Sequence, residues 1–325
     1  MYIGGVLDIV ILDGYCLNHG DLNWDGFSSL GNVKYFDRTP YEIIPERMGN
    51  ASILITNKCN IDKDLIDRLP CLKYVGVLAT GYNNVDLEYA AQKGITVTNI
   101  PTYGTESVVQ MVFALLLELY TSLRFHADSV NKGEWSSCPD FCYYKDGGLR
   151  ELFGKTIGII GYGRIGSRVG DVAQAFGMNV IAFDKYHSKK ETVSFRYSSS
   201  LEELLSNSDV VSLNCPLTKE NRNMINSESL SLMKKTAVLI NTARGPLVDE
   251  KALAIALNEG IISGAALDVL SQEPPLADNP IITAKNIVIT PHISWATHEA
   301  RSRLMDIAVS NLKAYISGMP ANKVN

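Results

Sequence analysis

The chain of 325 residues is long enough for two domains, and its 46% content of apolar residues is typical of a globular protein with a large core. Its net charge of -5, with lysine and arginine scattered along the sequence, gives no basic surface for nucleic-acid phosphates or an anionic membrane. The N-terminus lacks the features of a signal peptide, and the longest apolar stretch, 108–120, is shorter than the roughly 20 residues that span a bilayer. We therefore expect a cytoplasmic protein that binds neither nucleic acid nor membrane.

Short apolar runs alternate with helical patterns at the start of the chain. The expected strands are 6–12, 33–36, 53–56, 74–77 and 96–98, and the expected helices include 62–69 and 85–93. Asp62 is an N-cap and Gly94 a C-terminal stop for these helices. Strands that alternate with helices predict a parallel sheet with helices on both faces, so this part is expected to be a small α/β domain.

A glycine-rich turn follows the next strand. An apolar run at 157–160 leads into Gly161, Gly163 and Gly166, which have the spacing G-x-G-x-x-G, and a helical pattern comes next. The first glycine permits the turn, the second lets a pyrophosphate approach the backbone, and the third lets the helix pack close to the strand. A second apolar run ends in Asp184, whose carboxylate can bind an adenosine ribose. The sequence therefore predicts a dinucleotide site.

Strands and helices continue to alternate after this turn. The expected strands are 179–183, 210–214, 237–241, 265–269 and 287–290, and the expected helices include 201–206 and 249–260. This pattern predicts a doubly wound nucleotide-binding domain over 102–293. A last helix at 298–317 is expected to pack on the first domain, so that 1–101 and 294–325 together form one discontinuous domain.

Two segments of the second domain favour contact with another subunit. The helix expected at 106–123 is apolar on nearly all sides, which suits a crossover between domains or a subunit interface. The irregular segment 131–153 carries several aromatic residues, among them Trp135 and Phe141. Exposed aromatics in such a loop require a cover, which a homodimer partner would provide; an internal contact is the alternative.

Arg244, Glu273 and His292 each follow an expected strand of the second domain. Because the carboxyl ends of parallel strands meet at one edge of a sheet, the three side chains can converge there. Histidine exchanges a proton near neutral pH, a neighbouring carboxylate favours the imidazolium, and arginine binds a carboxylate through two hydrogen bonds. Each residue alone could belong to an ordinary turn, but together they suit hydride transfer between a nicotinamide and a 2-hydroxy acid.

The cysteines give no sign of a metal site. The six are Cys16, Cys59, Cys71, Cys138, Cys142 and Cys215, and no two form a C-x-x-C pair. Cys138 and Cys142 have no neighbouring histidine to complete a zinc site. We expect free thiols and no bound metal.

The chain resembles the NAD-dependent D-2-hydroxyacid dehydrogenases. The motifs that carry the resemblance are G-x-G-x-x-G at 161–166, N-T-A-R-G at 241–245, L-D-V-x-x-x-E-P at 267–274 and T-P-H-I-x-x-A at 290–296. Three further motifs, G-Y-N-N-V-D at 81–86, T-E-S-V at 105–108 and W-A-T-H-E-A-R at 295–301, are most similar to the glycerate dehydrogenase, or hydroxypyruvate reductase, group. The resemblance covers about 56–311. It implies an α/β fold in which a Rossmann NAD-binding domain is inserted into a flavodoxin-like substrate domain.

The resemblance also implies a role for each matching residue. Arg244, Glu273 and His292 match the family's catalytic residues. The loop whose backbone N–H groups bind the substrate carboxylate corresponds to Leu78, Ala79, Thr80 and Gly81. The expected cofactor contacts are Gly161, Gly163, Arg164, Ile165, Gly166, Asp184, Cys215, Pro216, Thr242, Ala243, Asp268 and His292. Arg244 and His292 are also expected to contact substrate, and Trp295, in place of a small residue, to narrow the substrate end of the cleft.

One departure from the family pattern lies in the cofactor region. Asn214 and Cys215 stand before the Pro-Leu-Thr turn, where many relatives have histidine, so the adenine-side contact there is in doubt. Asp184 favours NAD over NADP, because a 2'-phosphate would meet a carboxylate, although Lys185 is adjacent.

The resemblance implies reduction of hydroxypyruvate or glyoxylate to D-glycerate or glycolate, with His292 as the acid/base. Two alternatives remain at this point. The substrate can be another 2-keto acid or a phosphoglycerate, or the chain can be a non-catalytic, NAD(H)-sensing binding protein similar to the corepressors of this fold.

Overall fold

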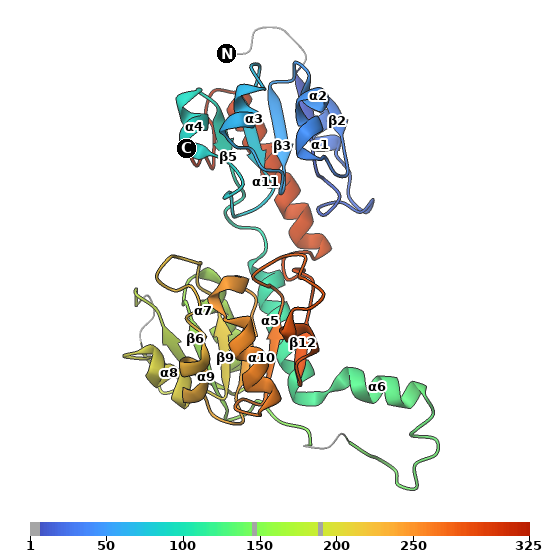
Figure 1. Cartoon of the computed structure of the whole chain (residues 1–325), viewed down its shortest axis with the longest axis vertical. Coiled ribbons are helices and arrows are strands. Elements are labelled where there is room, and N and C mark those ends of the chain that lie inside the picture. The colour runs from blue at the N-terminus through green and yellow to red at the C-terminus, as the bar shows by residue number, and fades with distance from the viewer. Residues whose placement is uncertain (1–6, 145–147, 188–190) are drawn as a thin grey trace. The chain divides into compact units, whose positions relative to one another are not determined.

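The computed structural model describes residues 7–144, 148–187 and 191–325, and the chain forms two compact units (Figure 1). Unit 1 is Met1–Gly104 together with Ala296–Asn325, and unit 2 is Thr105–Trp295. The chain therefore leaves unit 1, builds the whole of unit 2 and returns. The domain ends expected at 101 and 293 lie close to the ends of these segments, at 104 and 295.

Unit 1 is built on a parallel five-stranded sheet with the order β2-β1-β3-β4-β5. Its strands are β1 (Asp8–Ile11), β2 (Asn32–Tyr35), β3 (Ile53–Thr56), β4 (Tyr74–Val77) and β5 (Thr96–Thr98). Every residue of β3 and β4 is buried, which explains their continuous apolar sequences. Residue 6, the first of the strand expected at 6–12, lies outside the described residues.

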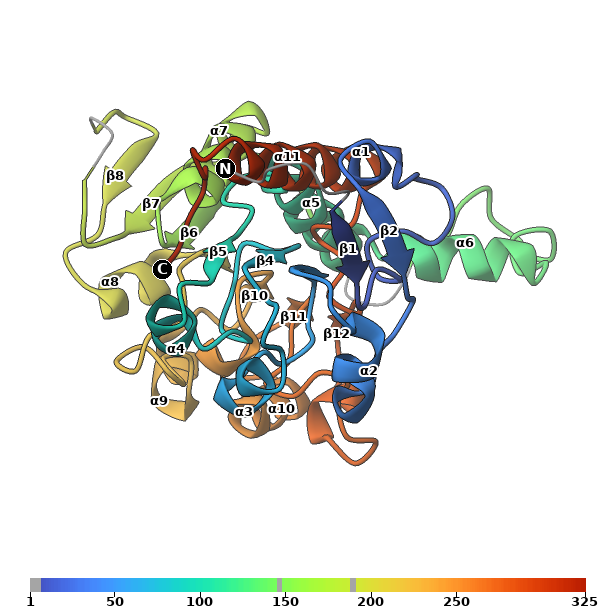
Figure 2. The ribbon, with the colours of Figure 1, turned by 90° about the horizontal axis from the view of Figure 1, so that it is seen from above.

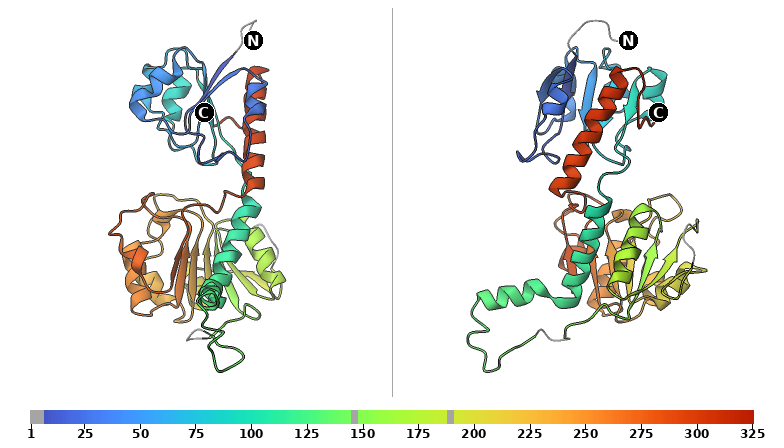
Figure 3. Two further views of the ribbon diagram at one scale, coloured as in Figure 1. Left: turned by 90° about the vertical axis from the view of Figure 1, so that its right-hand side faces the viewer. Right: turned by 180° about the vertical axis from the view of Figure 1, so that it is seen from behind.

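Helices cover both faces of this sheet. They are α1 (Asp25–Ser28), α2 (Ile44–Met48), α3 (Lys63–Asp67), α4 (Leu87–Gln92) and α11 (His298–Ile316), with a 3-10 turn at Tyr41–Ile43. α2, α3 and α4 lie on one face, and α1 lies beside α11 on the other (Figures 2 and 3). Asp62 caps α3 by accepting a hydrogen bond from the N–H of Leu65, and Asp86 caps α4 by accepting one from Tyr89.

Arg301 connects α11 to the N-terminal part of unit 1 through hydrogen bonds. Its guanidinium donates to both carboxylate oxygens of Asp21, at 2.8 and 2.6 Å, and to Leu17 O at 3.0 Å. The arginine is buried, and its hydrogen bonds lower the pKa of Asp21 to about 2. α11 therefore belongs to the same unit as the N-terminal part of the chain.

Unit 2 has a parallel seven-stranded sheet with the order β12-β11-β10-β9-β6-β7-β8. Its strands are β6 (Thr156–Ile160), β7 (Asn179–Phe183), β8 (Phe195–Tyr197), β9 (Val210–Leu213), β10 (Val238–Asn241), β11 (Gly264–Leu267) and β12 (Ile287–Ile289). From β6 the chain adds strands in one direction, and from β9 it adds them in the other. The order reverses between β6 and β9, which is where doubly wound sheets bind their ligands.

Two layers of helices enclose the sheet of unit 2. They are α5 (Thr105–Thr121) and α7 (Arg164–Ala175) on one face, and α8 (Leu201–Asn207), α9 (Ser227–Leu232) and α10 (Glu250–Asn258) on the other (Figure 3). Short 3-10 turns occupy Gly245–Leu247 and Pro280–Thr283. The α/β class predicted from the alternating pattern is thus confirmed in both units.

The helix expected at 106–123 differs from the prediction in length and burial. Glu106, Gln110, Ala114 and Leu117 are exposed, so α5 is buried on one side and is not apolar all round. Ser122 has a left-handed φ of 47°, which ends α5 and starts a second helix, α6 (Leu123–Asn131). α6 projects away from the sheet of unit 2 (Figure 1).

Among the described residues, no single helix is long and apolar enough to cross a membrane. The pair α5 and α6 passes such a test by length and composition, with a bend of 62°. The expected cytoplasmic location stays a prediction.

Candidate active site

The glycine-rich turn joins β6 to α7 and packs tightly except at its centre. Gly161 has a φ of +88°, and a Cβ there would lie 2.7 Å from the backbone N of Cys215. A Cβ at Gly166 would lie 2.0 Å from the carbonyl oxygen of Gly161. At Gly163, by contrast, a Cβ would meet nothing within 4 Å. Two glycines therefore serve close backbone contacts, and the third leaves open space beside the turn.

Backbone donors surround this open space. Gly163 is the N-cap of α7, and no side chain caps the helix. Within the described part of the chain, the N–H groups of Gly163, Ile165 and Gly166 make no hydrogen bond. Uncapped N–H groups at the start of a helix bind anions, so the residues present fit the pyrophosphate of a dinucleotide.

Asp184 follows β7 at the neighbouring strand end. Its carboxylate accepts hydrogen bonds from the N–H of Tyr162, in the glycine turn, and from the N–H of Tyr186 at 2.9 Å. The carboxylate is therefore fixed beside the turn. The predicted contact of this carboxylate with the ribose hydroxyl groups of NAD stays a prediction.

Two buried polar atoms that follow β9 and β10 have no hydrogen-bond partner among the described residues. Asn214 donates to Ser212 O at 3.1 Å, whereas its Oδ1 is buried without a hydrogen-bond partner in the described residues. Thr242 Oγ1, after β10, is buried in the same way. Cys215 is half-buried, and desolvation raises the pKa of its thiol. Asn214 was not among the expected contacts, and its Oδ1 is an acceptor available to a ligand.

Glu273 and His292 form a direct pair. His292 Nδ1 lies 2.6 Å from Glu273 Oε2, and the other carboxylate oxygen of Glu273 accepts a hydrogen bond from the N–H of Leu270 at 2.9 Å. The two side chains are 34% and 38% exposed, so the imidazole can be reached from outside. With Nδ1 directed at the carboxylate, Nε2 is left to exchange a proton with a substrate.

His292 has a left-handed backbone conformation, with a φ of 55°. Such a conformation costs roughly 1–3 kcal/mol in a residue other than glycine and persists only where neighbours hold it. The N–H of His292 donates to Asp268 O at 2.8 Å and to Thr290 O at 2.9 Å. The buried carboxylate of Asp268 accepts hydrogen bonds from Thr290 Oγ1, from the N–H of Ile293 and from the N–H of Ser294, at 2.6, 2.9 and 2.8 Å. Asp268, expected as a cofactor contact, therefore also braces the loop that carries His292.

Arg244 lies on the adjacent loop, after β10. Asn241 shapes this loop by accepting a hydrogen bond from Ala243 N at 3.0 Å and donating one to Arg244 O at 2.9 Å. A Cβ at Gly245 would lie 2.0 Å from the carbonyl carbon of Leu270, so only glycine lets this loop contact the one that carries Glu273. The guanidinium of Arg244 is exposed and donates to Ala243 O at 2.7 Å. The structure thus joins Glu273 to His292 and places Arg244 on a loop packed against theirs.

The loop 78–81 belongs to unit 1 and follows β4. Its carbonyl groups are engaged: Ala79 O accepts from Ile100 N at 3.0 Å, and Thr80 O accepts from Asn99 Nδ2 at 2.8 Å. The N–H groups of Ala79, Thr80 and Gly81 make no hydrogen bond within the described ranges. These three N–H groups are therefore free to bind an anion.

Leu78 differs from the three residues that follow it. Its N–H already donates to Thr56 O at 2.8 Å, because the hydrogen bonds of the sheet continue one residue beyond β4. Leu78 therefore has no N–H group left for a substrate, although it was expected among the residues that bind the carboxylate.

No group of three or more His, Cys, Asp or Glu residues in the described ranges could hold a metal ion. All six cysteines are free thiols.

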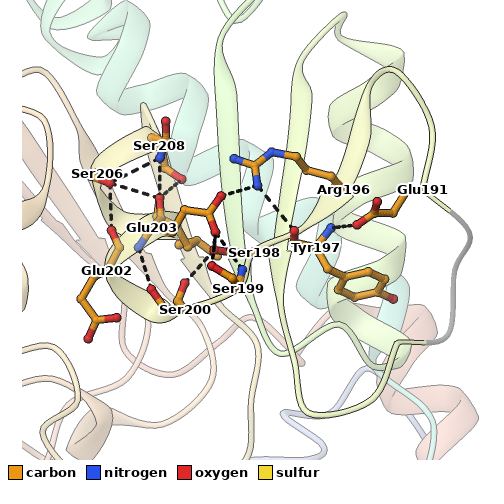
Figure 4. Close-up of polar contacts among 12 residues, drawn as sticks. Glu191, Arg196, Tyr197, Ser198, Ser199, Ser200, Glu202, Glu203, Ser206 and Ser208 are labelled. Atoms are coloured by element: carbon orange, nitrogen blue, oxygen red, sulfur yellow. Dashed lines mark hydrogen bonds and ion pairs between the residues drawn. The ribbon is translucent and has the colours of Figure 1, made fainter.

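A polar network lies at β8, the edge strand of the unit 2 sheet next to β7 (Figure 4). Glu203, in α8, accepts hydrogen bonds from Ser199 Oγ at 2.6 Å and Ser199 N at 2.8 Å, and pairs with Arg196 Nη1. Ser200 caps α8 by accepting a hydrogen bond from Glu203 N. These contacts, chiefly the Ser199 hydroxyl, lower the pKa of Glu203 to about 2. The network ties β8 to α8.

We expect Glu203→Gln to destabilise the protein at neutral pH and to have no such effect in acid. Because the pKa of Glu203 in the folded chain, about 2, lies below its ordinary value of 4.5, the carboxylate stabilises the fold above pH 4.5. That contribution is lost as the pH falls from 4.5 towards 2. Urea unfolding midpoints of the two proteins should therefore differ near neutrality and converge over this range. Glu228→Gln, at an exposed glutamate of α9, is the control, and a difference that does not change with pH would contradict the assignment.

The sequence did not indicate two contacts that hold the loop of His292: one from Ser107, and one from the indole nitrogen of Trp295, which was expected only to contact substrate. Ser107, in α5, donates its hydroxyl to Ser294 O at 2.6 Å, although the two residues are 187 positions apart. Trp295 Nε1 donates to His292 O at 2.9 Å. No local pattern indicates the Ser107 contact, because it depends on where the chain ends up after folding, whereas the Trp295 contact spans only three residues of the turn after β12.

Comparisons with known proteins show which family the chain resembles over most of its length. The family model for the D-isomer specific 2-hydroxyacid dehydrogenase NAD binding domain matches residues 113–294. The hydroxypyruvate reductase of Blautia hydrogenotrophica is 50% identical over 323 residues, which cover 98% of this chain and 100% of that protein. The glycerate dehydrogenase of Methylorubrum extorquens is 42% identical over 88% of this chain and 89% of its own. The solved structure of the D-lactate dehydrogenase from Aquifex aeolicus, complexed with NAD and lactic acid, has a TM-score of 0.81 and 33% identity, and covers 95% of this chain and 96% of its own.

Proposed function

Because the chain belongs to the D-isomer specific 2-hydroxyacid dehydrogenase family, we propose that it reduces hydroxypyruvate to D-glycerate, and glyoxylate to glycolate more slowly. Membership confirms the resemblance drawn from the motifs and the NAD-binding domain. It also makes the chain an oxidoreductase that acts on 2-hydroxy acids, in preference to a non-catalytic sensor. The observation that carries the proposal is the contact of 2.6 Å between His292 and Glu273, in the unit that holds the cofactor turn.

The proposed mechanism assigns the proton to His292. NADH, when bound at the glycine turn, supplies a hydride to the carbonyl carbon of the keto acid. His292 Nε2 donates a proton to the carbonyl oxygen as the alcohol forms, and Glu273 stabilises the imidazolium and fixes the tautomer. In the reverse direction the same nitrogen removes the hydroxyl proton.

Two groups are proposed to bind the substrate. Arg244 would bind its carboxylate through two hydrogen bonds and polarise the adjacent carbonyl. The N–H groups of Ala79, Thr80 and Gly81, which make no hydrogen bond within the described residues, are proposed as donors to a substrate carboxylate. The ring of Trp295, half-buried beside His292, is proposed to limit the size of the keto acid.

A panel of 2-keto acids with both reduced cofactors tests the function. We expect the fastest oxidation of NADH with hydroxypyruvate, a slower rate with glyoxylate, and little activity with NADPH, because a 2'-phosphate would meet the fixed carboxylate of Asp184. A preference for a phosphorylated acid would replace the proposed substrate. A chain that binds NADH but reduces no 2-keto acid would refute the proposal.

We also propose that the chain forms a homodimer through the segment 123–153, which we name the arm. Three large side chains of the arm are mostly exposed in the single chain: Trp135 at 53%, Phe141 at 89% and Phe153 at 78%. Residues 145–147 of the arm lie outside the described residues. Exposed aromatic side chains on one segment are typical of a protein interface.

Light scattering tests this dimer. The wild-type chain should have twice its monomer mass of 35.7 kDa, and Phe141→Glu should shift it to the monomer, because a buried charge opposes association. Ile255→Glu changes an exposed apolar residue of α10, outside the arm, and should leave the mass unchanged. A wild-type monomer, or a Phe141→Glu protein that remains dimeric, would contradict the assignment of the interface.

A further inference from the structure

The peptide group between His292 and Ile293 is held at both ends. Its N–H, on Ile293, donates to Asp268 Oδ1 at 2.9 Å. Its carbonyl, on His292, accepts the indole N–H of Trp295 at 2.9 Å. The orientation of this peptide sets the ψ angle of His292, so the two hydrogen bonds together fix the backbone on the carboxyl side of the histidine.

The amino side of His292 is fixed separately. Its N–H is shared between the carbonyl groups of Asp268 and Thr290. Asp268 therefore supplies three of the contacts around the histidine backbone, and Trp295 supplies the one on the histidine carbonyl. Without the indole donor, the carbonyl loses its protein partner and the peptide can rotate about its remaining anchor.

Release of this peptide would let His292 leave the left-handed region, because a positive φ is tolerated only over a narrow range of ψ. The left-handed φ of 55° directs the Cα–Cβ bond of His292 so that Nδ1 reaches Glu273 at 2.6 Å. A return to the ordinary, negative φ region redirects that bond and breaks the contact. The strained backbone is therefore useful only as long as its surroundings prevent relaxation.

We propose that Trp295 is a positioning residue for His292: its indole N–H keeps the histidine backbone in the left-handed conformation that pairs the imidazole with Glu273. The proposal rests on the acid/base role assigned to His292 above. This role of the indole nitrogen is separate from any steric effect of the ring on which keto acids can bind. A positioning role acts on turnover, whereas a steric role acts on substrate binding.

Two substitutions at Trp295 separate the nitrogen from the ring. Trp295→Phe removes the N–H and keeps an aromatic ring. Trp295→His removes the six-membered ring, but its Nε2 can superimpose on the indole nitrogen and, at a pH well above about 6.5, neutral imidazole still offers one N–H. The control is Trp24→Phe, the same substitution at a tryptophan of unit 1 that packs on Tyr35.

The measurements are kcat and KM for hydroxypyruvate, the Kd of NADH by fluorescence, and Tm to establish folding. We expect Trp295→Phe to lower kcat by about 10- to 100-fold, the effect of a small misplacement of a catalytic group, with KM and the NADH Kd nearly unchanged. Trp295→His should recover most of the lost kcat, and Trp24→Phe should match the wild type.

Two results would overturn the proposal while the wild type remains active. Wild-type kcat in Trp295→Phe would show that the N–H is not needed. A raised KM in both Trp295 variants, greater for histidine than for phenylalanine, would show that the ring acts on substrate size alone. If the wild-type chain itself reduced no 2-keto acid, the acid/base role proposed for His292 would be overturned too. That result differs from the two above, because in both of those the wild type is active.

Discussion

His292→Ala should lower kcat for keto-acid reduction by about 10²- to 10⁴-fold while the protein keeps its affinity for NADH. The imidazole of His292 pairs with Glu273 at 2.6 Å, and the substitution removes the proposed proton donor. The cofactor contacts proposed for the glycine turn would be made by backbone groups elsewhere in unit 2, so they should survive the substitution. Stopped-flow turnover and NADH fluorescence measure the two properties separately.

The control for this substitution is His298→Ala, at an exposed histidine in the first turn of α11. It should leave kcat unchanged, which would show that the loss of kcat is specific to the imidazole of His292. Normal turnover by His292→Ala would remove His292 from its role. A loss of NADH binding as large as the loss of kcat would instead assign His292 mainly to the cofactor.

Arg244→Lys should reduce kcat/KM for hydroxypyruvate by about 10- to 100-fold, chiefly through a higher KM. An ammonium group keeps the charge but cannot reproduce the two parallel hydrogen bonds that a guanidinium makes with a carboxylate. The backbone of the loop is held by Asn241 and by Gly245, so the substitution should not disturb the fold. Steady-state kinetics with hydroxypyruvate and glyoxylate measure the loss.

Arg68→Lys, at an exposed arginine of unit 1, provides the matched comparison and should have wild-type kinetics. If Arg244→Lys also behaved as the wild type, the bidentate contact with the substrate would be refuted. A fall in kcat alone, with KM unchanged, would show that Arg244 acts on the carbonyl and not on the carboxylate.

The sequence predicted those parts of the fold that depend on short stretches of chain. The glycine turn at 161–166 and the buried runs of β3, β4 and β6 have local signatures, and the strand ends follow from them. The short elements α1, α2, α9 and β8 were missed, because they have only three to six residues and no uninterrupted apolar run. α6 was also missed, because it begins at a left-handed serine and buries little of its surface.

The candidate site was predictable only as a set of residues. Arg244, Glu273 and His292 could be grouped because parallel strands end at the same edge of a sheet. The conformation of His292, the brace from Asp268 and the use of the Leu78 N–H within unit 1 depend on contacts between distant segments. No spacing of residues encodes such contacts, and the substrate roles of the 78–81 loop and of Trp295 stay predictions.

The 78–81 loop and the residues proposed for the redox chemistry lie in different segments of the chain. The glycine turn, Asp184, Arg244, Glu273 and His292 all lie within one uninterrupted stretch, Thr105–Trp295, whereas the 78–81 loop lies in the flanking sequence. The chain crosses between the units at only two places in the sequence, after Gly104 and before Ala296. Recombination at these two points would exchange the flanking segments and leave the nucleotide and proton-transfer residues on a single inherited block. If the 78–81 loop binds the substrate carboxylate as proposed, descendants of such a chain would differ at that contact, whereas Arg244 and Trp295 would stay with the residues of the redox chemistry.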